Sequence, residues 1–407
     1  MRDRALRAIA ECKHIATMTE EPGRITRRFL TPPVCEVHKH LEKRMAALGM
    51  ATSVDAVGNL RGLWRPNRAG DKRLILGSHI DTVPDAGAYD GVLGVTMALE
   101  WVGLAQELSL PIAIEVIAFS EEEGVRFGVP FIGSRAVAGR FDPALLLLVD
   151  IKGKTLEIAI REFGLDPGSH DHAAIDENVI GFVEIHIEQG PVLEVEGLAL
   201  AAVTGIVGQS RLSVEFSGQA NHAGTTPSHL RHDALAGAAE WIMAVETVAR
   251  GTDGLVATVG RILAEPNAAN VVPGTVKLSL DVRHGRDISR STAVEELMAQ
   301  AQTIANRRGL TLKSASMMDQ PAVPMDERLT ALLVEALEGE GMPGKRMPSG
   351  AGHDAMVMAT RVPTAMLFLR SPGGISHHPA ETVREEDVEA AMHVGRRFLD
   401  RLAAEQG

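Results

Sequence analysis

Apolar and polar positions form alternating blocks along the first half of the chain. Leu74–Gly77, Ile112–Phe119 and Phe182–Ile187 are apolar runs that predict buried strands, and Val95–Leu108 has a helical pattern. Apolar strands joined by a helix are typical of a parallel sheet that is covered on both faces. Polar residues follow each predicted strand. Functional sites in such sheets gather beyond the carboxyl ends of the strands.

The pattern changes near residue 208. From there the predicted order is strand, helix, strand, strand, helix, strand, which is the split βαβ arrangement. In order, the segments are Arg211–Phe216, Leu230–Arg250, Val256–Leu263, Val276–Val282, Thr292–Arg308 and Leu310–Ala315. We therefore predict an α/β fold with a larger domain over 1–210 plus 321–407, in which helices flank a mixed sheet. An inserted α+β, ferredoxin-like domain covers 211–320. Glu36–Leu48 and Asp387–Ala404 predict amphipathic helices of the larger domain.

Composition narrows the class of protein. The 407 residues carry a net charge of −12, which argues against nucleic acid as a general partner. Apolar residues make up 45% of the chain, yet no apolar run approaches the roughly 18 residues of a membrane helix. The N-terminus has no signal-peptide core, and two cysteines cannot form a disulfide framework. We expect a cytoplasmic protein that binds neither membranes nor nucleic acids.

Residues that carry chemistry cluster after the predicted strands and in one late loop. The candidates are His79, Asp81, Asp90, Glu121, Glu122, Glu123, His186, His377 and His378. Each cluster alone has a structural explanation: a surface hydrogen bond, a solvated acidic loop, a satisfied core histidine or a loop feature. Together, three imidazoles and two carboxylates suit a two-metal site with one bridging carboxylate. A further carboxylate, which is not a ligand, is needed to take a proton from the water that the metals share.

Eight segments, taken together, point to a known family. They are GSHIDTVPDAGAYDGVLGV (77–95), FSEEEGVRFG (119–128), HIEQGPVLE (186–194), GQANHAGTTP (218–227), NVVPG (270–274), DVRH (281–284), SGAGHDA (349–355) and GGISHHPAE (373–381). In these segments the chain resembles the M20 metallopeptidase superfamily, specifically its amidase/hydantoinase-carbamoylase branch. The segments run in the family's order across nearly the whole chain.

The resemblance implies two divalent metal ions per subunit, Zn²⁺ or Mn²⁺, with Co²⁺ as a third option. It implies that Asp90 bridges both metals, with His79 and His186 completing one site and Glu123 and His377 the other. Asp81 would orient His79, and Glu122 would be the general base. Glu121 could shift this assignment by one residue, but Gly124 favours the register given. The Gly-x-Ser-His pattern likewise favours His377 over its neighbour His378.

The resemblance also assigns the inserted domain as a lid and dimerisation domain, which implies a homodimer. His222 in this domain would polarise the scissile carbonyl. Asn270 and Arg283 resemble the pair that grips the substrate carboxylate, a role that suits the guanidinium fork. Gln189, Arg211 and His353 are further substrate-binding candidates.

The branch acts on small anionic ureides, so the expected substrate is a ureido compound with a carboxylate. PDAGAYDG (84–91) and RSPGGISH (370–377) are similar to segments of allantoate amidohydrolases. The expected reaction is therefore the hydrolysis of allantoate to ureidoglycine, ammonia and carbon dioxide. The alternatives are an N-carbamoyl-L-amino acid hydrolase or β-ureidopropionase, and then an M20 dipeptidase or aminoacylase. A binding module without activity would have lost metal ligands or the general base. This chain keeps the five expected ligands and Glu122.

Overall fold

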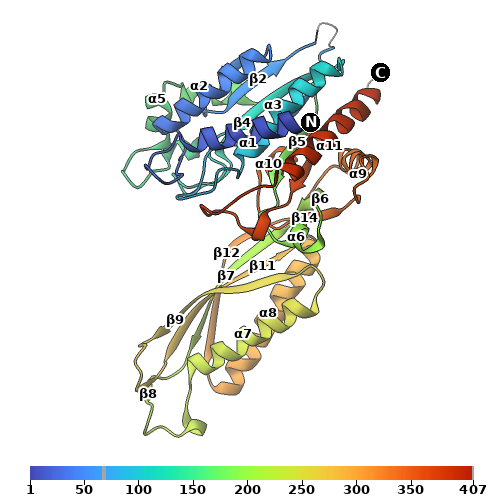
Figure 1. Cartoon of the computed structure of the whole chain (residues 1–407). Coiled ribbons are helices and arrows are strands. Elements are labelled where there is room, and N and C mark those ends of the chain that lie inside the picture. Colours follow the sequence, from blue (N-terminus) through green and yellow to red (C-terminus); the bar gives the residue numbers. More distant parts are fainter. Residues whose placement is uncertain (67–69, 406–407) are drawn as a thin grey trace. The chain divides into compact units, whose positions relative to one another are not determined.

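The chain folds into two compact units. The computed structural model describes residues 1–66 and 70–405 (Figure 1). One unit comprises Met1–Thr204 and Pro324–Gly407, and the other comprises Gly205–Val323. The boundaries expected from the sequence, 211 and 320, fall just inside the second unit. The difference arises because β7 begins at Gly208, before the alternating pattern becomes clear.

A mixed nine-stranded sheet organises the first unit. Its order is β1-β2-β4-β3-β5-β15-β6-β13, and β14 pairs with β6. β3 runs parallel to β4 and β5, and β5 runs parallel to β15. β2 pairs antiparallel with β1 and β4, and β6 pairs antiparallel with β15. This confirms the predicted mixed sheet. The strands are β1 (Ala51–Val54), β2 (Leu60–Trp64), β3 (Arg73–His79), β4 (Ala113–Phe119), β5 (Val179–Ile187), β6 (Leu200–Ile206), β13 (Val323–Pro324), β14 (Arg346–Ser349) and β15 (Thr364–Leu369).

Helix α3 (Val92–Glu107) lies at the centre of the first unit's core. It contacts β3, β4 and β5 together with α1 (Arg2–Ala16) and α11 (Glu385–Ala404). Its residues from Val92 to Ala105 are all buried, as expected for a helix covered on every side. Gly94 permits the close approach to the sheet, because a Cβ there would lie 2.1 Å from the Ile185 carbonyl oxygen.

The remaining helices of the first unit are shorter or more peripheral. They are α2 (Pro32–Ala47), α4 (Ile132–Val137), α5 (Leu156–Glu162), α6 (Val192–Glu196), α9 (Glu327–Gly339) and α10 (Asp354–Met358). Helix α2 begins at Pro32 rather than at the predicted Glu36, because proline is well accommodated in the first helical turn. No helix within residues 1–66 and 70–405 is long and apolar enough to span a bilayer.

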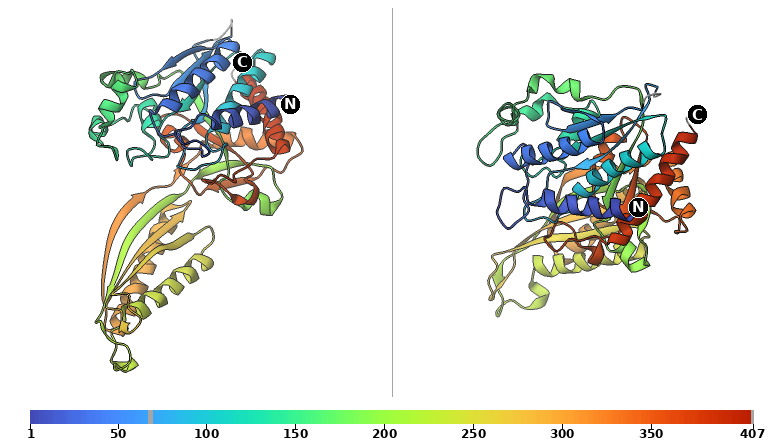
Figure 2. Two further views of the ribbon diagram at one scale, coloured as in Figure 1. Left: turned by 60° about the vertical axis from the view of Figure 1, so that its left-hand side comes forward. Right: turned by 45° about the horizontal axis from the view of Figure 1, so that its top comes forward.

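The second unit is a four-stranded antiparallel sheet with two helices on one face (Figure 2). The strand order is β12-β7-β11-β9, with α7 and α8 packed against β7 and β11. This is the predicted split βαβ arrangement. Its elements are β7 (Gly208–Ser217), β8 (Asn221–His222), α7 (Ala234–Gly251), β9 (Val256–Glu265), β10 (Val271–Val272), β11 (Thr275–His284), α8 (Asp287–Arg308) and β12 (Thr311–Gln320).

Both helices of the second unit begin at residues other than those predicted. Helix α7 begins at Ala234 rather than Leu230, because the Asp233 carboxylate caps it by accepting a hydrogen bond from the Ala236 N–H. Helix α8 begins at Asp287, several residues before the predicted Thr292. An apolar pattern marks the buried face of a helix but not its first turn, which explains both errors.

Candidate metal centre

The carboxyl ends of the parallel strands bring together residues that are far apart in sequence. His79 ends β3, Glu122 and Glu123 follow β4, and His186 lies near the end of β5. His377 comes from the loop after β15, and Asp90 from the turn that precedes α3. This is the edge at which the sequence predicts a site.

The Asp90 carboxylate lies between three imidazoles. Its Oδ1 is 3.6 Å from His79 Nε2 and 3.2 Å from His186 Nε2, and its Oδ2 is 3.1 Å from His377 Nε2. Glu123 Oε1 lies 3.4 Å from His377 Nε2. Two groups of potential ligands therefore share Asp90: one with His79 and His186, the other with Glu123 and His377. Among the described residues, no group forms a hydrogen bond with the buried Oδ1 of Asp90, an atom that a cation would satisfy.

Backbone carbonyls set the tautomers of two histidines. His79 Nδ1 lies 3.0 Å from the Asp81 carbonyl oxygen, and His186 Nδ1 lies 2.9 Å from the Ile187 carbonyl oxygen. A carbonyl can only accept, so Nδ1 carries the proton in both rings. In the neutral ring, each Nε2 then presents a lone pair toward Asp90 Oδ1, which is the form that binds a metal. The donor set therefore fits a divalent cation.

Asp81 contacts both His79 and the acidic loop after β4. Its carboxylate Oδ1 is 3.7 Å from His79 Nδ1, and its carbonyl is the nearer acceptor. The carboxylate also accepts the N–H groups of Glu122 at 3.0 Å and Glu123 at 3.1 Å. Asp81 thus ties the end of β3 to the acidic loop after β4. The sequence could not show this, because the partners lie about 40 residues away.

The three consecutive glutamates have different surroundings. Glu121 has a φ of 51°, and its carboxylate accepts the N–H groups of Arg126 and Phe127, so it shapes the loop. Glu122 and Glu123 form a further group of potential ligands with His79. Burial, followed by the charge of Asp90, raises the pKa of Glu123 to about 7. Burial raises the pKa of Glu122 well above its usual value.

Burial alone would raise the pKa of Asp90, but the imidazoles of His186, His377 and His79 around its carboxylate outweigh this effect. They hold the pKa of Asp90 well below its usual value, so this group is ionised. Gln189 supports it as well, because its Nε2 donates to Asp90 Oδ2 at 3.0 Å. The amide of Gln189 thus contacts a potential metal ligand, and its role in substrate binding stays a prediction.

Two further histidines, His353 and His378, lie near the potential metal ligands. His353 is buried, donates to or accepts from Ser349 Oγ at 2.9 Å, and packs edge-on against the His186 ring with centroids 4.4 Å apart. Burial, followed by the charge of His186, holds its pKa well below the usual value. His378 is exposed, and its Nδ1 accepts the Ala380 N–H. His377, not His378, therefore faces Asp90.

The predicted residues of the second unit lie on its strands, except Asn270, which lies in the turn before β10. His222 is exposed on β8, and its Nδ1 accepts the N–H groups of Gly224 at 3.1 Å and Thr225 at 3.2 Å. The ring proton of a neutral His222 is therefore on Nε2, which can donate. The Asn270 carbonyl accepts the Ala223 N–H at 2.9 Å, so Asn270 lies beside His222.

Arg211 on β7 and Arg283 on β11 share one carboxylate. Arg283 Nε donates to Asp281 Oδ1 at 2.9 Å, and Arg211 Nη2 donates to Asp281 Oδ2 at 3.0 Å. Asp281 and Arg211 are directly opposite in the antiparallel ladder. The structure thus brings the two predicted arginines together on neighbouring strands.

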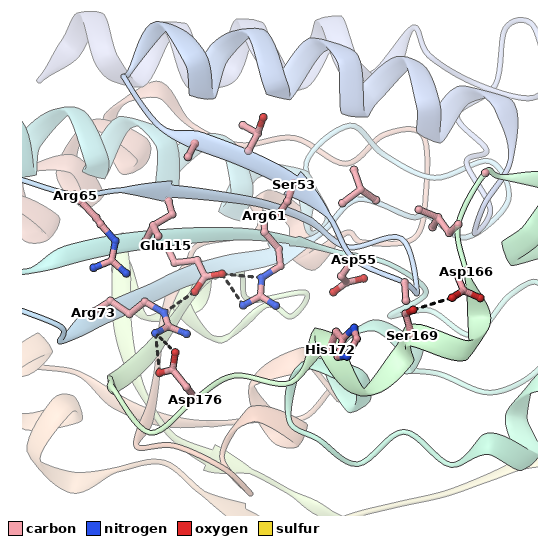
Figure 3. A pocket seen from close by; sticks show the side chains of 17 residues that line it. Ser53, Asp55, Arg61, Arg65, Arg73, Glu115, Asp166, Ser169, His172 and Asp176 are labelled. Carbon is pink, nitrogen blue, oxygen red and sulfur yellow. Dashed lines mark hydrogen bonds and ion pairs between the residues drawn. The ribbon is translucent and has the colours of Figure 1, made fainter.

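A separate cavity of about 720 Å³ lies beside β1 and β2 in the first unit (Figure 3). Arg61 and Arg73 both donate to Glu115 at 2.7 Å, and Arg73 also contacts Asp176 at 2.8 Å. None of its 17 lining residues is a candidate ligand of the metal centre. Its charged groups largely satisfy one another, so we assign it no catalytic role.

Comparison with known proteins places the chain among amidohydrolases. It is 37% identical to an allantoate deiminase from Arabidopsis thaliana, covering 97% of this chain and 81% of that protein. It is 36% identical to an N-carbamoyl-L-amino acid amidohydrolase from Geobacillus stearothermophilus, covering 91% and 92%. A solved amidase of the hydantoinase/carbamoylase family from Burkholderia multivorans superposes with a TM-score of 0.91 at 30% identity, covering 98% and 97%.

A second solved structure shows a ligand. AtUAH in complex with glyoxylate superposes with a TM-score of 0.76 at 31% identity, covering 98% of each chain. The model of peptidase family M20/M25/M40 matches residues 75–401, which include every candidate ligand. The chain therefore belongs to peptidase family M20/M25/M40, and it is a metal-dependent hydrolase.

Proposed function

We propose that this protein hydrolyses a ureido C–N bond in a small carboxylate substrate, and that the substrate is allantoate. The observation that carries the proposal is the Asp90 carboxylate, which three imidazoles approach to within 3.1–3.6 Å. Two metal ions fit the two groups of ligands that share Asp90. Imidazole and oxygen donors without thiolate suit Zn²⁺, Mn²⁺ or Co²⁺. When bound, such metals polarise a carbonyl and lower the pKa of water.

Glu122 is the residue that we assign as general base. It is buried, lies beside His79 and Glu123, and belongs to none of the groups that share Asp90. It takes a proton as water adds to the ureido carbonyl, and it returns that proton to the leaving nitrogen. One water is consumed for each ureido group. The products of allantoate are then ureidoglycine, carbon dioxide and ammonia.

The resemblance to the family supports roles for three residues of the second unit. His222 donates from Nε2 to the developing oxyanion, because its Nδ1 is already an acceptor for two backbone N–H groups. Asn270 and Arg283 recognise the substrate carboxylate. Structures of AtUAH in complex with glyoxylate and with (S)-hydroxyglycine support a small carboxylate as ligand. We further propose a homodimer formed through the second unit.

The choice of substrate rests on sequence segments rather than on overall identity. Identities of 37% to an allantoate deiminase and 36% to an N-carbamoyl-L-amino acid amidohydrolase do not separate the two substrates. The segment Asp85–Gly91, with Tyr89 before Asp90, is similar to that of allantoate amidohydrolases. An N-carbamoyl-L-amino acid hydrolase is the second candidate, favoured by the relative from Geobacillus stearothermophilus.

The experiment measures ammonia release by metal-stripped protein resupplied with Mn²⁺ or Zn²⁺. Allantoate is compared with a panel of N-carbamoyl-L-amino acids, and with N-acyl amino acids and dipeptides as controls. Metal-dependent turnover of allantoate supports the proposal. Turnover confined to the carbamoyl panel would establish the second candidate, and turnover confined to acyl amino acids or dipeptides would refute ureide hydrolysis.

A further inference from the structure

Glu381 is a buried carboxylate that the catalytic roles above do not use. Its residue is 5% exposed. Its Oε1 accepts the N–H groups of Tyr89 at 2.9 Å and Asp90 at 3.0 Å, and its Oε2 accepts the Ser376 hydroxyl at 3.1 Å. One side chain thereby joins two loops that lie almost 300 residues apart in the sequence.

Both of these loops carry potential metal ligands. The first holds Asp90, whose carboxylate is shared by the two ligand groups, and the second holds His377, immediately after Ser376. Ser376 Oγ also lies 3.2 Å from Asp90 Oδ2, so the hydroxyl connects the two carboxylates. Glu381 therefore binds both loops, and with them it fixes the spacing between Asp90 Oδ2 and His377 Nε2.

Steric contact reinforces the hydrogen bonds. A Cβ at Gly87 would lie 2.3 Å from both Cβ and Oε1 of Glu381, so the backbone of the first loop presses directly against this side chain. A glycine is required there for the approach. Steric contact as well as hydrogen bonding therefore fixes where the loop before Asp90 packs against Glu381.

We propose that Glu381 is a positioning residue that fastens the Asp90 loop to the His377 loop and so sets the spacing of these two metal ligands. The inference rests on the proposed two-metal function. Removal of its carboxylate leaves two backbone N–H groups without their acceptor and releases Ser376. Groups that support metal ligands typically change metal affinity or activity by about 10–100-fold when mutated.

The test compares Glu381→Ala and Glu381→Gln with the wild-type chain in metal binding. Metal-free proteins are titrated with Zn²⁺ in competition with a chromophoric chelator, and the visible spectrum of the Co²⁺-loaded protein reports ligand geometry. We expect Glu381→Ala to lose about 10–100-fold in metal affinity and to show an altered Co²⁺ spectrum. Glu381→Gln should retain most of the affinity, because its amide oxygen accepts both N–H groups and its amide nitrogen can donate to Ser376.

Glu100→Ala is the matched control for a merely structural role. Glu100 is 2% exposed and accepts hydrogen bonds from Arg4, Arg7 and Arg44, well along α3 from the metal ligands. This control should lower the melting temperature while leaving the Zn²⁺ affinity and the Co²⁺ spectrum unchanged. If the two alanine variants weaken Zn²⁺ binding equally, or if Glu381→Ala binds Zn²⁺ like the wild type, the inference is overturned.

A milder variant covers the case in which Glu381→Ala does not fold. Ser376→Ala removes only the hydroxyl between Glu381 and Asp90, and it should still weaken Zn²⁺ binding and alter the Co²⁺ spectrum. Unchanged binding in a folded Ser376→Ala protein would overturn the inference. Because the readout is metal affinity, it is independent of the substrate: a wild-type protein that binds Zn²⁺ but leaves ureides intact refutes the proposed function alone.

Discussion

Replacing Gly91 by alanine tests the metal centre without changing any candidate ligand. Gly91 precedes α3 with φ 66° and ψ −51°, and the Val92 N–H donates to the Asp90 carbonyl across it at 2.7 Å. This three-residue γ-turn is strained for a residue with a side chain. A Cβ at Gly91 would lie 2.5 Å from Cγ, Cδ2 and Cε1 of the His79 ring.

The size of the effect follows from these distances. Ordinary van der Waals contact begins at 3.4 Å, so the His79 ring must retreat by about 0.9 Å from a methyl group at 2.5 Å. A misplacement of about 1 Å can lower turnover by about 100-fold. Backbone strain of this kind costs about 1–3 kcal/mol in the free energy of unfolding. The strain lowers stability, and the displaced ring lowers metal affinity.

Gly49→Ala separates these two effects. Gly49 also has a positive φ, 68°, but a Cβ there would meet no atom within 4 Å. Both variants should lose stability in denaturant titrations of the metal-free protein. Only Gly91→Ala should lose Zn²⁺ affinity and ureide turnover. If Gly91→Ala binds Zn²⁺ with wild-type affinity and turns over normally, His79 is not a ligand held at this position, and the reasoning is refuted.

Further outcomes are expected elsewhere in the first unit. Glu122→Gln should retain bound metal but lose about 10²–10⁴-fold in kcat; full turnover would show that another group takes the proton. Burial lowers the pKa of His38 to about 4 from 6.5, so the unfolded chain binds the proton first as the pH falls. The free energy of unfolding should therefore drop by up to about 3 kcal/mol between pH 6.5 and 4, and His38→Leu should remove this part of the pH dependence in denaturant titrations; identical profiles would contradict it. Cys12 is fully buried and burial raises its pKa to about 12, so a thiol reagent should label only Cys35 in the folded protein; two rapidly reacting thiols would show that α1 opens. Zn²⁺ at about 1,000 times its Kd should raise the free energy of unfolding by about 4 kcal/mol, measured by thermal unfolding with and without a chelator; an unchanged melting temperature would argue against a metal site in the folded chain.

Local sequence patterns predicted the architecture and the residues that could form a metal site. Apolar runs such as Ile112–Phe119 predicted the buried strands, because a strand covered on both faces must be apolar along its whole length. The alternation from residue 211 onward predicted the order of the second unit. Imidazole and carboxylate residues after strand ends indicated a metal site, because parallel strands end at one edge of the sheet.

These patterns could not show which partner each side-chain atom contacts. The carboxylate of Asp81 holds the Glu122 and Glu123 N–H groups, whereas its carbonyl receives His79 Nδ1. The segment that ends in Glu381 was recognisable, but the contact of this carboxylate with the Tyr89 and Asp90 N–H groups was not. The roles of His222 and Arg283 in substrate binding stay predictions.

The sequence by itself determined which elements form, which side chains are available for metal chemistry and which family the chain resembles, since these depend on residue type, spacing and periodicity. Only the tertiary structure decided which atom of each side chain faces which partner. The hydrogen bond from the Asp90 N–H to the Glu381 carboxylate joins positions 291 residues apart, and it depends on loop paths that packing selects. Residue type and spacing thus determine which chemistry the site can perform. Contacts between segments far apart in the sequence determine its geometry.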